Sequence, residues 1–271
     1  FPLHEILRSN PILQHLRSIK EPEELELLQK ACNITEKGVR RLLSFVKPGV
    51  WEYEIEAELM HEFLRNRSKG FAYTPIIASG ENANVLHYIA NNMQCKDGDV
   101  ILLDVGAEYA NYSSDLTRMI PVNGKFTARQ KEIYNAVLDM KNFATSLLVP
   151  GNNWYDYHKE CGEFYTSKFL ELGLLDKADV QNQDKNWPAY KKYMMHGTSH
   201  HLGLDTHDYG ILKDKFVENM VFTVEPGIYL PAEGFGVRIE DDMVIQNSGP
   251  AFNLMKNIPI EVEEIEELMN S

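Results

Sequence analysis

Cysteine is scarce in this sequence: Cys32, Cys95 and Cys161 are the only ones among 271 residues, and no two have the C-x-x-C spacing. An odd number of widely spaced cysteines argues against a disulfide framework or a zinc knuckle. We therefore expect all three to pack in the interior of a protein from a reducing compartment, with the cytoplasm as the default. Long apolar runs are also missing, since none approaches the roughly 20 residues that cross a bilayer.

Basic residues are outnumbered by acidic ones. Lys and Arg total 27 against 40 Asp and Glu, which gives a net charge of −13. A surface of that sign repels the phosphates of nucleic acids and anionic membranes, so we predict neither as a partner. The hydrophobic fraction of 44% and the charged fraction of 25% are typical of a folded domain and exclude intrinsic disorder.

The first 20 residues differ from the rest of the chain. The sequence opens at Phe1 with no basic-then-apolar signal segment, and Pro2 and Pro11 interrupt a stretch without long apolar periodicity. We interpret 1–20 as a linker or the remnant of a missing N-terminal domain in a longer or processed polypeptide. Residues 21–271 then form one large domain.

Proline, glycine and acidic residues mark the ends of the predicted helices. A first helix starts at Glu21, where the glutamates suit a helix N-terminus, and a Pro-Gly pair at 48–49 stops it. Apolar residues four apart predict a second helix over about 51–69. A capping-box pattern at 127–130 predicts a third, which also ends in Pro-Gly. Apolar stretches predict strands at 76–77, 100–103, 116–122, 221–224 and 237–240.

A short internal repeat indicates two related halves. The segments 46–53 (VKPGVWEY) and 148–155 (LVPGNNWY) share Pro-Gly, an aromatic pair and a place between two helices. The polar stretch 176–192 breaks this symmetry, and we predict an inserted surface loop there. The acidic tail from Glu261 carries spaced apolar residues and predicts a final amphipathic segment.

Two aspartates flank a predicted hairpin centred near Tyr109 and Ala110. Asp104 and Asp115 are symmetric about that centre, so we expect their carboxylates to face each other with Cβ atoms roughly 5 Å apart. Two like charges at that separation cost about 3 kcal/mol at an effective dielectric near 20. A fold keeps such a pair if a cation lies between them; two solvated acids beside a turn are the alternative.

Two glutamates interrupt apolar strand patterns. Glu225 follows the strand at 221–224, directly before Pro-Gly, and Glu240 ends the pattern at 237–240, where Arg238 shares its face. Buried carboxylates need a partner or a metal. An ion pair with Arg238 or a lysine would satisfy Glu240, whereas no basic residue near Glu225 in the sequence offers itself.

Four of the nine histidines lie in HGTSHHLGLDTHD, residues 196–208. His196 and His200 have the spacing of a helical zinc-binding pair, but the glutamate that such a motif needs is a glycine here, and Gly-Thr-Ser disfavours a helix. We predict an extended segment with one metal-ligating histidine. The other histidines would then support that ligand or contact the substrate.

Charge balance connects these side chains. Four carboxylates and two divalent cations balance formally, with one neutral imidazole completing the shell, whereas a single cation would leave excess negative charge in a partly buried site. An oxygen-rich ligand set favours Mn²⁺, with Co²⁺, Zn²⁺ or Fe²⁺ as alternatives. Two ions about 3.5–4 Å apart form the arrangement that activates water for hydrolysis.

A resemblance to a known family rests on these residues and their contexts: Asp104, Asp115, His200, Glu225 and Glu240, in LLDVGAEY, HGTSHHLGLDTHD, TVEPGIY and VRIEDD. The chain resembles the metallopeptidases of the pita-bread fold, above all aminopeptidase P and next prolidase, from about residue 20 to 245. The resemblance implies an α+β fold with two pseudo-symmetric halves and a curved, mostly antiparallel sheet covered by helices, as the repeat suggests.

The resemblance also implies a function for the domain at 21–271. Members of this group use two metal ions, usually Mn²⁺, to remove the N-terminal residue from peptides with proline in second position. In that scheme Asp104 chelates one metal, and Asp115 and Glu240 bridge both. His200 and Glu225 complete the shell of the second metal. Glu225 also handles the proton of the attacking water.

Further residues are implied as substrate contacts. FAYTPIIASGENANVLHY resembles the approach to the family's active-site histidine, which would be His87. By the resemblance, His87, His196 and His207 hold the substrate and stabilise the developing oxyanion or the leaving imino nitrogen. Arg238 orients Glu240 or the substrate, and Tyr73 lines the pocket. The partner is then a peptide with a free N-terminus.

Two features depart from the family. Aminopeptidase P and prolidase carry a separate N-terminal domain that bears on substrate length and assembly, where this chain has only some 20 residues; we expect a homo-oligomer for the full-length protein. His201 has no role in the scheme. The alternatives are a prolidase, which cleaves Xaa-Pro dipeptides, and an inactive binding module, which would be expected to have lost metal ligands.

Overall fold

The computed structural model describes residues 3–271. Its α-helices are α1 (Asn10–Ser18), α2 (Pro22–Phe45), α3 (Glu52–Arg65), α4 (Ala128–Ser146), α5 (Trp154–Glu171), α6 (Lys177–Gln181) and α7 (Val262–Met269). Its short 3-10 segments are η1 (Gly80–Asn84), η2 (Ala189–Lys192) and η3 (Pro231–Glu233). Its strands are β1 (Ile76–Ser79), β2 (Val100–Val105), β3 (Glu108–Tyr109), β4 (Tyr112–Ser113), β5 (Leu116–Pro121), β6 (Val221–Val224), β7 (Gly227–Leu230), β8 (Phe235–Arg238), β9 (Asp241–Val244) and β10 (Phe252–Asn253). None of the helices described within 3–271 combines the length and apolar character that crossing a bilayer requires.

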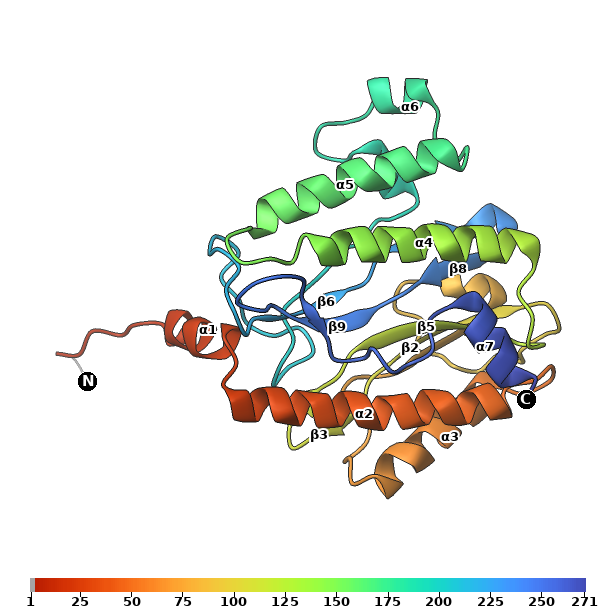
Figure 1. Ribbon diagram of the computed structural model, residues 1–271, viewed down its shortest axis with the longest axis horizontal. Helices are drawn as coiled ribbons and strands as arrows, with labels where there is room; N and C mark the ends of the chain where they lie inside the picture. Colours follow the sequence, from red (N-terminus) through yellow and green to blue (C-terminus); the bar gives the residue numbers. More distant parts are fainter. Residues whose placement is uncertain (1–2) are drawn as a thin grey trace.

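Two three-stranded antiparallel sheets lie between two layers of helices (Figure 1). Their strand orders are β1-β2-β5 and β10-β9-β6, and two hairpins, β3-β4 and β7-β8, accompany them. Helices α2 and α3 cover one side, and α4 and α5 cover the other. A single-residue bridge between Thr117 in β5 and Glu240, just before β9, connects the two sheets. Acidic residues at the ends of strands from both sheets therefore come together.

The helix starts follow the capping patterns of the sequence. Helix α2 begins directly after Glu21 and a capping box at Thr127 begins α4, both as predicted, whereas the capping box between Glu21 and Glu24 was not predicted. The end of α3 differs from the expectation, because the helix stops at Arg65 and not at Lys69. Arg67 adopts a left-handed conformation with φ of 71°, which a continuing α-helix cannot contain.

The two Pro-Gly segments occupy equivalent places. One connects α2 to α3, and the other connects α4 to α5. Gly49 and Gly151 both have a positive φ, of 96° and 90°, and each donates its N–H to a distant carbonyl at 2.9 Å, of Cys95 and Phe216 respectively. Glycine suits this conformation because it has no Cβ. The repeat therefore marks two pseudo-symmetric halves, as predicted.

The expected register of the first hairpin is wrong. Asp104 pairs with Thr117, while Asp115 lies just before β5. The turn is centred on Ala110 and Asn111, which have φ of 52° and 71°, one residue later than expected. A turn with two left-handed residues closes a two-residue hairpin, and its later position moves the partner of Asp104 by two residues.

The inserted stretch and the C-terminal tail are both helical in part. Residues 176–192 are largely exposed, as predicted for a surface insertion, but they contain α6 and η2. The side chain of Asp176 caps α6, a signal that the sequence analysis did not use. The amphipathic tail is confirmed, since α7 buries Val262 and Ile265.

The N-terminal segment is more ordered than a linker requires. Phe1 and Pro2, which belong to the predicted linker, lie outside the described residues. Residues 10–18 form α1, which begins with Pro11 in its first turn. The assignment of 1–20 as a linker or domain remnant stays a prediction.

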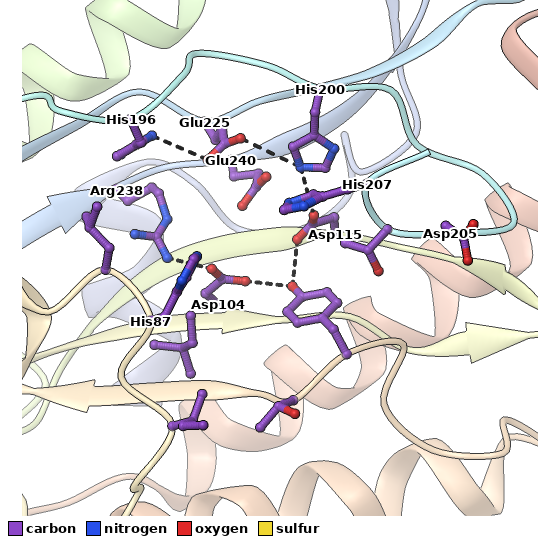
Figure 2. A pocket seen from close by; sticks show the side chains of 16 residues that line it. His87, Asp104, Asp115, His196, His200, Asp205, His207, Glu225, Arg238 and Glu240 are labelled. Carbon is purple, nitrogen blue, oxygen red and sulfur yellow. Dashed lines mark hydrogen bonds and ion pairs between the residues drawn. The ribbon is translucent and has the colours of Figure 1, made fainter. Parts of the chain in front are cut away.

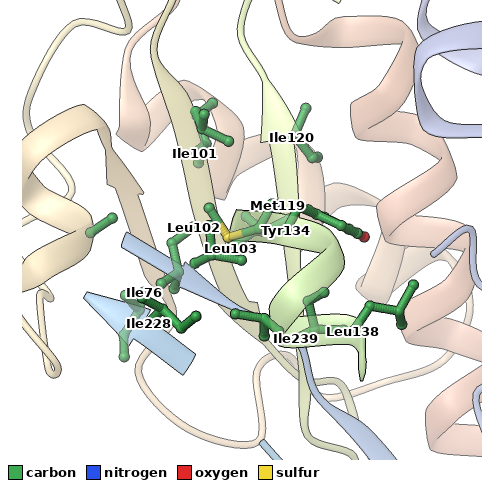
Figure 3. Close-up of a cluster of buried hydrophobic side chains, with 14 of the residues drawn as sticks. Ile76, Ile101, Leu102, Leu103, Met119, Ile120, Tyr134, Leu138, Ile228 and Ile239 are labelled. Atoms are coloured by element: carbon green, nitrogen blue, oxygen red, sulfur yellow. The ribbon is translucent and has the colours of Figure 1, made fainter. Parts of the chain in front are cut away.

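Apolar side chains fill the space between strands and helices. Figure 3 shows Ile101 of β2 opposite Ile120 of β5 and Leu102 of β2 beside Met119, with Tyr134 of α4 and Ile239 in the same cluster. Both faces of β2 are buried because helices cover both sides of the sheet, which explains its continuous apolar pattern. The three cysteines are free and buried, as the sequence analysis expected.

The interior also contains a cluster of buried charged side chains, formed by Arg118, Lys141 and Asp241. Arg118 donates to Asp241 Oδ1 at 2.5 Å and to the main-chain carbonyl of Glu240 at 2.7 Å, and Lys141 of α4 also pairs with Asp241. Burial tends to raise the pKa of Asp241, but the two cations outweigh it, and the net shift is downward. Through the hydrogen bond from Arg118 to the Glu240 carbonyl, this cluster fixes the main chain of Glu240.

We expect Asp241→Ala to lower the free energy of unfolding by about 3–5 kcal/mol, because it leaves two cations buried without their partner. Urea unfolding measures this. The control is Arg129→Gln, which removes an ion pair of partly exposed side chains with Glu233 at 2.8 Å and costs about 0–1 kcal/mol. Equal unfolding free energies for the two variants would contradict the structural role of Asp241.

Candidate metal centre

One cavity of about 590 Å³ contains every side chain that the sequence analysis selected as a site residue. Its walls include Tyr73, His87, Asp104, Asp115, His196, His200, His207, Glu225, Arg238 and Glu240. Apolar residues line another part of the wall: Ile76, Leu86 and Ile89. The cavity thus has a charged part and an apolar part, as is typical of ligand-binding sites.

The carboxylates reach the cavity from strand ends. Asp104 lies near the end of β2, and Asp115 directly precedes β5. Glu225 directly follows β6, and Glu240 lies between β8 and β9. These strands belong to both halves of the fold, so the site exists only where the halves meet.

Direct contacts connect four of the predicted ligands (Figure 2). The Tyr73 hydroxyl lies 2.6 Å from Asp104 Oδ1 and 2.6 Å from Asp115 Oδ1. A hydroxyl has one proton, so Tyr73 donates to one of the two carboxylates at a time. His200 Nε2 lies 3.3 Å from Asp115 Oδ2 and 3.6 Å from Glu225 Oε1.

Asp115, His200 and Glu240 form a group that can hold a metal ion, because one ligand atom from each lies within 4.8 Å of the others. His200 Nδ1 donates to the carbonyl of His201 at 3.0 Å, which leaves Nε2 facing the carboxylates. Such a hydrogen bond on the far nitrogen orients a metal-binding imidazole. Carboxylates with one imidazole suit Mn²⁺, Zn²⁺ and related divalent ions.

The electrostatics of the cavity favour added positive charge. Burial raises the pKa of Glu225 to about 7, against the attraction of His200 and Arg238. Burial and the neighbouring carboxylates raise the pKa of Glu240 well above its usual range, and burial also raises that of Asp104. Burial opposes charge on His200, but Asp115 and Glu225 outweigh it and raise its pKa to about 9. In the metal-free protein, protons on these side chains therefore supply positive charge at positions where divalent cations fit.

Arg238 pairs with Asp104 and not with Glu240. Its Nη2 donates to Asp104 Oδ2 at 2.5 Å, its Nη1 to Tyr229 Oη at 2.7 Å and its Nε to Thr117 Oγ1 at 3.2 Å. Thr117 in turn donates to Glu240 Oε2 at 2.6 Å. The hydrogen bonds between Arg238 and Glu240 therefore run through Thr117, while the charge of Arg238 also acts on Glu240 across the cavity.

The sequence analysis missed Thr117 and Tyr229. In an extended chain, side chains two or four residues apart lie on the same face. Thr117 lies two residues after Asp115 and Tyr229 lies four residues after Glu225, so this spacing could have predicted both as neighbours of the site. The hydrogen bonds that connect them to Arg238 depend on contacts between distant segments.

His196 is neutral in this arrangement. Burial lowers its pKa to about 3. Its Nδ1 donates to the carbonyl of Gly197 at 2.7 Å, so its Nε2 accepts from the Tyr229 hydroxyl at 2.7 Å. The 3.5 Å approach of His196 to Glu225 is therefore no ion pair. The backbone at 194–200 is not helical, as predicted, so no helix brings His196 and His200 onto one face; it bends at His196 and Thr198 and forms no strand.

The other histidines divide between cavity and core. His87 and His207 line the cavity, and the ring of His207 lies 4.3 Å from that of His200 in an edge-on arrangement. Burial lowers the pKa of His207. His201 packs against Phe222 at 4.3 Å between ring centres, and burial lowers its pKa to about 3. His201, unexplained by the sequence, is therefore buried beside Phe222 and does not line the cavity.

A model of metallopeptidase family M24 matches residues 26–247, most of the chain. The chain belongs to this family. A Xaa-Pro aminopeptidase of Haemophilus influenzae is 42% identical over 98% of this chain, and one of Escherichia coli is 40% identical over 96%. The chain spans 64% and 61% of the lengths of these two relatives.

Solved structures agree with the sequence comparison. A zinc-substituted aminopeptidase P from Escherichia coli in complex with product superposes with a TM-score of 0.90 at 38% identity, covering 97% of this chain and 62% of that one. The same enzyme with the inhibitor Pro-Leu gives the same TM-score and identity. The predicted pita-bread fold is therefore confirmed.

We expect Mn²⁺ to raise the Tm of chelator-treated protein more at pH 8 than at pH 6, because protons on His200 and Glu225 compete with the metal. In the metal-free protein, the raised pKa of His200 stabilises the fold below about pH 6.5, and this stability is lost as the pH rises through about 9. Thermal unfolding with and without Mn²⁺ measures both effects. His61→Gln, an exposed histidine, is the control. A metal response independent of pH would contradict the assignment.

Proposed function

We propose that this chain is the catalytic part of a metal-dependent Xaa-Pro aminopeptidase, which releases the first residue from peptides with proline in second position. The observation that carries the proposal is the convergence of four carboxylates and His200 on one cavity that also contains His87, His196 and His207. Relatives at 40–42% identity that bear this name support the choice of substrate.

The proposed cofactor is a pair of divalent metal ions, Mn²⁺ before Co²⁺, Zn²⁺ or Fe²⁺. Their proposed ligands are Asp104, Asp115, His200, Glu225 and Glu240. When bound, such ions supply Lewis-acid activation of water and of the scissile carbonyl. Support comes from the ligand atoms of Asp115, His200 and Glu240, which lie within 4.8 Å of one another, and from the upward pKa shifts of the carboxylates.

Glu225 is the proposed proton carrier. Its carboxylate lines the cavity, where it can accept a proton and return it. In the proposed reaction, the Glu225 carboxylate takes a proton from the attacking water and delivers it to the imino nitrogen of the leaving proline. Its position beside His200, at 3.6 Å, keeps the carboxylate in the charged part of the cavity.

The remaining side chains orient the substrate. His87 and His207 face the cavity and would donate to the carbonyl oxygen as negative charge develops on it. His196 would contact the substrate from a ring fixed by Tyr229. Arg238 holds Asp104, and Tyr73 lines the pocket between the two aspartates.

A prolidase is the second candidate. The Xaa-Pro dipeptidase of the mouse is 34% identical over 96% of this chain, and the chain covers 62% of its length. A non-catalytic binding module has less support, because none of the proposed ligands is replaced in this sequence.

We expect the protein with Mn²⁺ to release the first residue of Xaa-Pro-Xaa tripeptides, with little turnover of Xaa-Pro dipeptides or Met-Ala-Xaa peptides. Chromatography of the released amino acid measures the three rates under matched conditions. Preference for the dipeptide would replace the proposal by prolidase activity. No turnover of any peptide by protein that has bound two metal ions would contradict both.

Two substitutions separate metal binding from substrate binding. Asp104→Asn is expected to weaken binding of at least one metal ion and to lower turnover by orders of magnitude, with the fold retained. His87→Ala is expected to keep the metal content and lower turnover by about 10²-fold, as for loss of one oxyanion donor. Elemental analysis and peptide kinetics measure these effects. Loss of metal in His87→Ala would instead make His87 a ligand.

A further inference from the structure

The N-terminal segment contacts the loop that supplies His207 to the cavity. We call residues 203–209 the His207 loop. Arg17, in the last turn of α1, lies 2.8 Å from Asp205 Oδ2 and 2.6 Å from Asp208 Oδ1 through its Nη2. Its guanidinium also lies 4.8 Å from the centre of the Tyr209 ring. Figure 1 shows α1 at the edge of the molecule, beside the loops of the second half.

A buried lysine strengthens this contact. The side chains of Lys20 and Asp208 are each only 1% exposed, and Lys20 Nζ lies 3.5 Å from Asp208 Oδ2. Lys20 Nζ also donates to the main-chain carbonyl of Arg17 at 2.7 Å. Asp208 thus has cations on both of its carboxylate oxygens, and both come from the same N-terminal segment. Buried charges of this kind are costly unless they are paired.

The backbone conformation of the His207 loop permits the pairing of Asp208 with Lys20 and Arg17. A Cβ at Gly203 would overlap Asp208 Oδ2, so only glycine permits the close approach. The N–H of Gly203 donates to the carbonyl of Asp205 at 3.1 Å, and the N–H of Asp208 donates to the carbonyl of His201 at 2.9 Å. The carbonyl of Gly203 accepts from Ser113 of β4 at 2.9 Å. The loop is therefore fixed at one end to β4 and at the other to the N-terminal segment.

The opposite side of the loop faces the site. Asp205, Thr206 and His207 line the cavity, and the His207 ring packs edge-on against His200. Asp208, held by Lys20 and Arg17, is the next residue in the chain. A displacement of Asp208 therefore moves the backbone of His207.

We propose that Lys20 and Arg17 are positioning residues that hold Asp208 and thereby fix His207 against the substrate cavity. The catalytic consequence rests on the proposed peptidase function, whereas the contact itself does not. Because a misplacement of about 1 Å at a reacting group can cost about 10²-fold in rate, a contact outside the cavity controls turnover.

A first experiment tests the contact without any substrate. Hydrogen exchange of the Gly203 and Asp208 amides is measured in the wild type, in Lys20→Met and in the milder Arg17→Gln, whose side chain is 20% exposed. We expect exchange at these amides to be at least about tenfold faster in both variants. Arg129→Gln, which removes an ion pair outside the cavity, is the matched control and leaves it unchanged. Wild-type exchange rates in both N-terminal variants would overturn the proposal.

A second experiment tests the effect on His207 through peptide kinetics with metal content monitored. We expect Lys20→Met to keep its metal and to lose about 10- to 100-fold in kcat/KM, with most of the loss recovered in Lys20→Arg. Combined with His207→Ala, Lys20→Met should cause little further loss, because both act on one group. Additive losses would overturn the proposal. An inactive wild type with fast exchange in Lys20→Met would reject the peptidase function and leave the contact established.

Discussion

Like charges crowded into one partly buried cavity dominate the energetics of this protein. Two carboxylates 4 Å apart repel each other by about 4 kcal/mol at an effective dielectric near 20, and Asp104, Asp115, Glu225 and Glu240 all reach the same space. Burial raises the pKa of Glu225, with Asp115 and Asp104 adding to the shift, and the attraction of Asp115 and Glu225 raises the pKa of His200. The Tyr73 hydroxyl and Arg238 reduce the repulsion among the carboxylates, and divalent cations would remove most of it.

The scaffold around the cavity resists that repulsion by holding Glu240 through contacts outside the cavity. Arg118 and Lys141 neutralise Asp241 and fix the backbone of Glu240, and the Thr117 bridge connects one sheet to the other. These contacts come from both halves of the fold. Neither half has a site of its own, so the pseudo-symmetric arrangement and the proposed chemistry depend on the same interface.

The His207 loop at the edge of the site is held in a similar way, by ion pairs to a buried aspartate. Asp208 is paired with Lys20 and Arg17, just as Asp241 is paired with Arg118 and Lys141. In each case the residue next to the paired aspartate faces the cavity. Removing one partner of a buried ion pair leaves a charge without compensation at a cost of about 3–5 kcal/mol, so these pairs resist displacement of the aspartates.

The sequence by itself determined the starts of α2 and α4, the repeat and the set of metal-binding candidates, because these depend on local spacing and on residue chemistry. Capping at Thr127 and the positions of Asp104 and Glu225 at strand ends are local features of this kind. Only the tertiary structure decided that Asp104 faces Thr117 and pairs with Arg238, that Tyr229 holds His196, and that Lys20 reaches Asp208. Those contacts join residues far apart in the chain, so no local pattern contains them, and for Asp104 a one-residue shift of the turn was enough to change its partner.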